Sequence, residues 1–160
     1  EKNLINILDI FSQWKIRATF FWLGWMARNY PDLLLLCKER GHEIASHGDM
    51  HILPFKSSKN EFIYDLKKSK DSIESLINKK IVGFRAPGFG VKDNNTNNWF
   101  FEELVKNDIR YDSSIFPANR GHGGLKYKNS NPLIIYTKYG NLIEFPQTII
   151  KFLKRVLRGA

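Results

Sequence analysis

The spacing of apolar residues changes repeatedly along the chain between a helical period and short, dense runs. Residues 3–14 repeat apolar positions as a helix with one buried face does. Residues 17–22 form an apolar run rich in aromatics, which predicts a buried strand. The same alternation predicts further helices over 31–40, 58–78 and 97–106, and further strands over 42–46, 81–85 and 109–111.

Local signals mark where some of these elements begin and end. Pro31 suits the first turn of a helix, and Gly41 follows the last. Ser58 and Glu61 have the spacing of a capping box at a helix start. Beyond a glycine-rich segment at 121–124, two strand-like runs flank Tyr139-Gly140-Asn141 and predict a hairpin.

Strands that alternate with helices predict a parallel α/β arrangement, either a barrel or an open doubly wound sheet. With 160 residues the chain can bury a core of its own, so we expect residues 1–160 to form a single domain. In both arrangements functional side chains gather in the loops that leave the carboxyl ends of the strands. Catalytic or ligand-binding residues are therefore expected in those loops.

Composition narrows the function only a little. The net charge of +9 is dispersed, and its densest part, residues 151–158, predicts a basic amphipathic surface helix rather than a contact with membrane or RNA. Cys37 lies in an apolar run, which predicts a buried and inert thiol. No apolar stretch is long enough to cross a bilayer. Both termini look cut, so the bacterial cytoplasm and the cell envelope both stay open as locations.

The loop after the strand at 42–46 contains two histidines four residues apart, His47 and His51. Neutral imidazoles at this spacing can bind one divalent ion, and nitrogen ligands suit zinc and its neighbours. Gly48 between them permits a tight backbone path, so a curled loop is expected. The alternative is two histidines with structural hydrogen bonds.

The next two strands also end in polar chemistry. Arg85 could hold a carboxylate ionised, and the turn at Pro87-Gly88 could present backbone N–H groups to an oxyanion. Asp112 could orient a histidine in the cleft, or it could simply cap a turn. Imidazoles, a guanidinium and a carboxylate are thus all expected on one rim.

Three segments in this order, residues 47–51 (HGDMH), 85–89 (RAPGF) and 111–114 (YDSS), resemble successive motifs of the polysaccharide deacetylase family (NodB homology, carbohydrate esterase family 4). The resemblance covers about residues 16–120. The run 111–117 (YDSSIFP) is similar to the branch associated with bacterial exopolysaccharide and exosortase gene clusters.

The resemblance implies a partial, distorted (β/α) barrel and a hydrolase that removes N-acetyl groups from amino sugars of a polysaccharide. It implies that His47 and His51 are two of three protein ligands of a divalent metal, with zinc the ion best suited. It further implies that Arg85 orients an aspartate base and that the Gly88 N–H helps to hold the oxyanion. Asp112 matches the acidic residue that supports a histidine acid.

Several parts of the family pattern are missing from the sequence. No acidic cluster precedes the first helix, and no late Leu-x-His motif follows. Asp9 lies within a predicted helix and His122 within a glycine-rich loop, so neither suits the missing roles. Asp49 lies between the histidines and could touch the metal or the substrate, but it is a poor candidate for the base. We therefore expect two metal ligands and their supporting groups, with weak or no turnover by this chain alone.

Two other classes of function stay open. The first is a catalytically inactive carbohydrate-binding domain of the same fold, in which Trp22, Trp25 and Trp99 would stack on sugar rings. The second is nucleic-acid binding through the basic tail, which ranks lower because aromatic and basic residues are not interleaved there.

Overall fold

The structure is a computed structural model of the chain, and it describes residues 2–92, 95–118, 124–125, 130–152 and 155–158. Its main sheet has six strands in the order β1-β2-β3-β4-β6-β5. The first four strands run parallel, β6 continues parallel to β4, and β5 returns antiparallel to β6. These strands are β1 (Thr19–Trp22), β2 (Glu43–Ser46), β3 (Gly83–Phe84), β4 (Tyr111–Asp112), β5 (Leu133–Thr137) and β6 (Gly140–Glu144).

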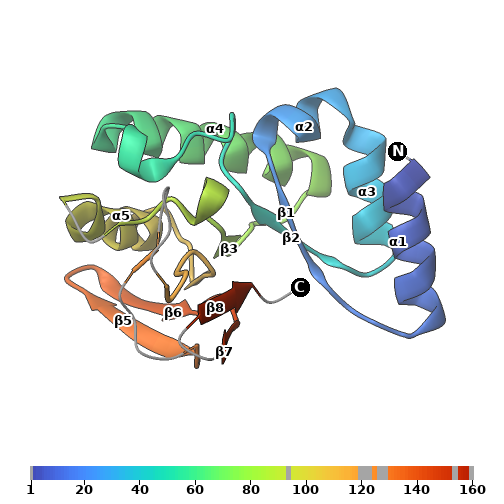
Figure 1. Cartoon of the computed structure of the whole chain (residues 1–160). Coiled ribbons are helices and arrows are strands. Elements are labelled where there is room, and N and C mark those ends of the chain that lie inside the picture. Colours follow the sequence, from blue (N-terminus) through green and yellow to red (C-terminus); the bar gives the residue numbers. More distant parts are fainter. Residues whose placement is uncertain (1, 93–94, 119–123, 126–129, 153–154, 159–160) are drawn as a thin grey trace.

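Helices surround the outer side of this sheet (Figure 1). The helices predicted from apolar spacing are present as α1 (Lys2–Gln13), α3 (Pro31–Glu39), α4 (Lys59–Ile77) and α5 (Asn95–Lys106). Ser58 forms the expected capping box, because its hydroxyl accepts the Glu61 N–H and the Glu61 carboxylate accepts the Ser58 N–H. Two short 3₁₀ helices, η1 (Pro54–Lys56) and η2 (Pro87–Phe89), lie in the loops after β2 and β3.

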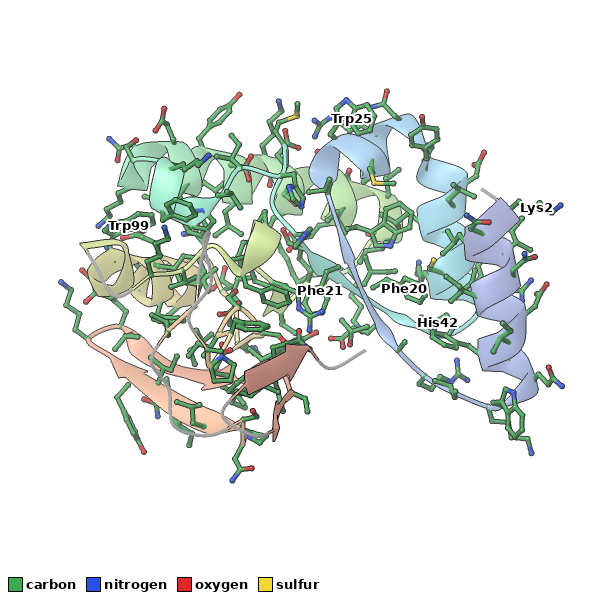
Figure 2. All side chains as sticks on the ribbon, in the orientation of Figure 1. Lys2, Phe20, Phe21, Trp25, His42 and Trp99 are labelled. Carbon is green, nitrogen blue, oxygen red and sulfur yellow. The ribbon has the colours of Figure 1, made fainter. Side chains whose placement is uncertain are left out.

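The helices cover one face of the sheet, the core face. Phe84 of β3 contacts Phe62 of α4 and Phe100 of α5 on this face. Phe20 of β1 contacts Phe11 of α1 on the same face, whereas Phe21 points to the other one (Figure 2). A sheet with helices on one face only is built like part of a barrel wall, not like a doubly wound sheet. The partial (β/α) barrel is the arrangement that the chain adopts.

The core has two parts. The first lies between α4, α5 and strands β3 and β6, and the second joins α1, α3 and the end of α4 to β1 and β2. Cys37 of α3 belongs to the second part and has no exposed surface. The prediction that this thiol is buried is confirmed, and burial raises its pKa to about 11, which disfavours the reactive thiolate.

One prediction about local structure was wrong, and one helix was not predicted. Strand β1 ends at Trp22, and a short helix, α2 (Gly24–Asn29), follows it. The tail expected to be a basic helix forms two antiparallel strands instead, β7 (Ile149–Phe152) and β8 (Arg155–Arg158). Adjacent β-branched residues at Ile149 and Ile150 favour an extended backbone, and a helix this short gains little from propensity alone. Within the described residues, no helix is both long and apolar enough to cross a membrane.

Candidate metal centre and its supporting residues

The carboxyl ends of the parallel strands form one aligned row. Strand pairing connects Trp22, Ser46, Phe84, Asp112 and Glu144 across β1, β2, β3, β4 and β6. Since side chains alternate along a strand, the residues that follow this row point to the opposite face. That face, which we call the site face, lies away from the helices.

The next row places predicted residues side by side on the site face. The N–H groups of His47, Arg85 and Ser113 each donate to a carbonyl of the neighbouring strand, at 2.8, 3.0 and 3.0 Å. Phe21, one residue before the end of β1, lies on the same face, and the Arg85 guanidinium stacks on its ring at 4.3 Å. The fold therefore brings His47 and Arg85 together as the sequence predicted.

His47 is held in a defined tautomer. Its Nδ1 lies 2.7 Å from the carbonyl oxygen of Arg85, and because a carbonyl only accepts, Nδ1 carries the hydrogen and donates. Nε2 is then the nitrogen with a free lone pair. Burial lowers the pKa of His47 to about 4, so the imidazole is neutral at physiological pH. A neutral imidazole with one nitrogen fixed by a carbonyl is the usual state of a metal ligand.

His51 reaches the same place through a curled loop. Gly48 has φ of +79° and His51 has φ of +59°, so the chain turns twice through the left-handed region. The two imidazole rings come to lie with centroids 5.1 Å apart and planes inclined at 71°. His51 is exposed to solvent, whereas His47 is mostly buried. The predicted curled loop, not a helical turn, juxtaposes the two imidazoles.

Asp65, which the sequence did not single out, fastens this loop to α4. Its carboxylate accepts the backbone N–H groups of Asp49 at 2.7 Å and Met50 at 3.0 Å. A side chain at position 48 would meet this carboxylate, because an added Cβ would lie 2.6 Å from Asp65 Oδ2. The helical position of Asp65 carried no signal for this role, since a carboxylate on a helix is usually solvated.

Asp49 does not face the candidate metal site. It is 1% exposed, and Arg28 of α2 binds both of its carboxylate oxygens, at 2.6 and 3.1 Å. Lys68 of α4 lies 3.3 Å from the same carboxylate. The possibility that Asp49 touches the metal is therefore corrected, since its carboxylate ties α2 to α4. The unexpected helix α2 is what supplies Arg28.

Arg85 and Gly88 lie in the segment that follows β3. The Arg85 Nε donates to the Ser113 carbonyl at 3.1 Å, and Nη2 donates to the Ser113 hydroxyl at 2.7 Å. Gly88 has φ of +59° within η2, a conformation that glycine adopts without strain. Among the described residues, none accepts a hydrogen bond from the Gly88 N–H. The roles of both residues in catalysis stay predictions.

Asp112 lies on the core face, not in the cleft. It is fully buried, and its Oδ1 accepts a hydrogen bond from the Ser114 hydroxyl at 2.6 Å. Its partner across the sheet is Glu144, which is buried as well. No histidine is near Asp112 in the described part of the chain, so the expectation that its carboxylate belongs to the cleft rim is corrected. The alternation of side chains along β4 decides this, because it points Ser113 to the site face and Asp112 away from it.

Two residues considered for the missing roles, Asp9 and His122, are not placed at the site by the structure. Asp9 lies on α1, far in sequence from the loops that follow β2 and β3, and its carboxylate binds Arg40 at 2.5 Å. His122 lies outside the described residues. The described ranges hold no cluster of three or more His, Cys, Asp and Glu side chains suited to a metal. The three tryptophans considered for stacking on sugar differ in exposure. Trp22 is buried and Trp99 packs against the core. Trp25, labelled in Figure 2, is 42% exposed.

Comparison with known proteins gives the family. Residues 1–100 match the family model for polysaccharide deacetylase, which is well over half of the 160 residues. The chain therefore belongs to the polysaccharide deacetylase family. It is 31% identical over 88 residues to a peptidoglycan-N-acetylglucosamine deacetylase of Bacillus cereus, a match that covers 55% of this chain and 41% of that protein. The chain thus spans less than half the length of this relative.

Solved structures agree on the fold. A Mycobacterium smegmatis protein described as a polysaccharide deacetylase superimposes with a TM-score of 0.76 at 23% identity, covering 91% of this chain and 45% of that one. A pseudoenzyme of carbohydrate esterase family 4 from Bacillus anthracis superimposes with a TM-score of 0.62 at 20% identity, covering 68% of this chain and 37% of that one.

Proposed function

We propose that this chain carries the histidine pair of a divalent-metal centre in a deacetylase that hydrolyses N-acetyl groups on the amino sugars of a polysaccharide. The observation that carries the proposal is the state of His47, which is neutral, has its Nδ1 hydrogen bound to a carbonyl, and lies beside His51. Family membership supports the reaction class. The Bacillus cereus relative, named for an N-acetylglucosamine substrate, supports the substrate class.

The residues present fit such a metal as two of its ligands. His47 and His51 would hold the ion, and zinc suits a pair of nitrogen donors. When bound, a divalent metal supplies Lewis-acid polarisation of the acetamide carbonyl and lowers the pKa of a bound water. Arg85 is fixed by Ser113 and Phe21 on the same face, where it can hold a carboxylate base ionised. The Gly88 N–H can stabilise an oxyanion.

Zinc titration calorimetry tests the metal centre. We expect stoichiometric binding to the chain and its loss in the His47→Ala, His51→Ala double variant. The single variant His122→Ala removes an imidazole elsewhere in the sequence and should bind as the wild type does. Equal binding by the double variant and the wild type would refute the proposal. In the whole protein, acetate release from N-acetylglucosamine oligomers should stop when a chelator is added.

A second candidate is supported by one observation, the exposed Trp25 at the start of α2 beside the β1 end. Its indole contacts the Tyr30 ring edge-on, and its exposed part can stack on a sugar ring, as in a carbohydrate-binding domain without catalysis. The two candidate functions predict different behaviour of the double histidine variant. Glycan binding that survives in the His47→Ala, His51→Ala variant and falls in Trp25→Ala favours the binding domain, whereas loss of metal with loss of acetate release favours the deacetylase.

A further inference from the structure

Two buried carboxyl groups lie side by side behind the site. Asp112 of β4 and Glu144 of β6 are register partners, and neither has exposed surface. One oxygen of each has a donor, since Ser114 Oγ donates to Asp112 Oδ1 at 2.6 Å and the Ile115 N–H donates to Glu144 Oε1 at 2.8 Å. The other two oxygens, Asp112 Oδ2 and Glu144 Oε2, have no partner among the described residues. A proton between them would satisfy both.

Electrostatics favour such a shared proton. Burial raises the pKa of Glu144, and the neighbouring Asp112 raises it further. Burial also raises the pKa of Asp112. The Arg85 guanidinium, on the site face, interacts electrostatically with both carboxyl groups across the sheet, while the phenol of Tyr111, next along β4, has a raised pKa and stays neutral. Two adjacent negative charges in a buried site are strongly unfavourable, so the pair keeps one proton and one charge, which Arg85 balances.

A short chain of hydrogen bonds leads from this pair to His47. The Ser114 hydroxyl, which donates to Asp112, accepts the Ala86 N–H at 2.8 Å. This N–H belongs to the peptide group between Arg85 and Ala86, and the carbonyl of the same peptide group accepts from His47 Nδ1. Because a peptide group is planar, fixing its N–H also fixes the direction of its carbonyl. The carboxyl pair on the core face thereby orients an imidazole on the site face.

We propose that Asp112 and Glu144 share one proton and, through Ser114 and the Arg85–Ala86 peptide group, act as positioning residues for His47. The shared proton is independent of the proposed function. The positioning of His47 as a metal ligand rests on that function, so the two parts are tested by different readouts on metal-free and zinc-loaded protein.

The shared proton is tested by the pH dependence of folding in metal-free protein. Folding takes up a proton wherever the unfolded Glu144 is ionised and the folded pair is protonated, that is, above the ordinary carboxyl pKa of about 4.3. Relative to Glu144→Gln, the folding equilibrium constant of the wild type should fall by up to about tenfold per pH unit from about pH 5 upward. Parallel curves for the two proteins would overturn the shared proton.

Glu103→Gln is the matched control. Glu103 is also buried, but Lys59 and Lys106 bind it at 2.8 and 3.2 Å, and it has a lowered pKa. It is ionised in both the folded and unfolded states above pH 5, so its replacement should leave the slope of the wild type unchanged.

The positioning role is tested by ¹⁵N NMR of the imidazoles in metal-free protein. In the wild type the His47 signals should report hydrogen on Nδ1. In Ser114→Ala we expect a mixture of the two tautomers, and about tenfold weaker zinc binding. Ser113→Ala releases the Arg85 side chain but not the peptide group, so its His47 signals should match the wild type. An unchanged His47 tautomer in Ser114→Ala, or in Ser114→Cys if the alanine variant does not fold, would overturn the positioning role.

A failure of the proposed function gives a different pattern. Wild-type protein that binds no zinc would contradict the metal centre, while the pH slope and the His47 signals would still decide whether the carboxyl pair exists and orients the imidazole.

Discussion

The role of the Asp49 side chain is set by its partners in the fold rather than by its neighbours in sequence. It lies between two histidines, yet its carboxylate is buried against Arg28 and Lys68. Removing one member of a buried ion pair leaves the other charge without compensation, which costs far more than losing a solvated pair. Arg28 is 35% exposed, so part of this cost is relieved by water.

The prediction at this scale concerns Arg28→Met. We expect it to lower the free energy of unfolding by about 2 kcal/mol, because among the described residues Lys68 is then the one basic partner left to the buried Asp49. Arg40→Met is the control, since it breaks the exposed pair with Asp9 and should cost less than about 1 kcal/mol. Urea denaturation measures both, and equal losses in the two variants would show that the buried pair contributes nothing special.

At the scale of elements, the loop at residues 47–51, which carries the proposed metal ligands, takes its shape from the helix beside it. α4 begins at a capping box and runs past the loop at residues 47–51, where Asp65 binds two of the loop N–H groups. Helix α2 closes onto α4 at Gly24, where an added Cβ would lie 2.7 Å from the Ser69 backbone. The loop is thus held from outside by secondary structure that contributes no ligand of its own.

Asp65→Ala tests this dependence. The variant leaves the N–H groups of Asp49 and Met50 without their acceptor, so the imidazoles should lose their fixed separation. We expect zinc affinity to fall by about 10- to 100-fold, as for other residues that support ligands. Asp71→Ala removes an exposed carboxylate from the same helix and should leave the affinity unchanged. Calorimetry on both variants gives the answer, and equal affinities would mean that the loop holds its own shape.

At the scale of the whole molecule, buried histidines and the buried carboxyl pair change the folding stability in opposite directions as the pH changes. His47 has a folded pKa of about 4, below the ordinary value of 6.5, so it stabilises the folded state above pH 6.5 and loses this contribution as the pH falls. Burial also lowers the pKa of His42, which adds to the loss in acid. The carboxyl pair acts in the opposite direction, because its raised pKa values weaken folding as the pH rises.

The histidine contribution can be isolated by difference. Between pH 7 and pH 5, the wild type should lose about 2 kcal/mol of stability relative to His47→Gln, because burial makes protonation of His47 unfavourable in the folded state. His51→Gln is the control, since His51 is exposed. Both are measured by denaturation in the presence of chelator. A difference that does not change with pH would contradict a buried, neutral His47.

The sequence by itself determined the order of the helices and parallel strands, the capping box of α4, the hairpin of β5 and β6, and the positions of His47, Arg85 and Gly88 after strand ends. These features depend on interactions between residues close in sequence, or on a period that reflects one buried face. Tertiary structure decided which face each strand-end residue takes. It turned Asp112 toward Glu144, brought Arg28 to Asp49, and placed Asp65 against the loop at residues 47–51. Each of these depends on strand register or on contact between distant segments, and a linear pattern carries neither.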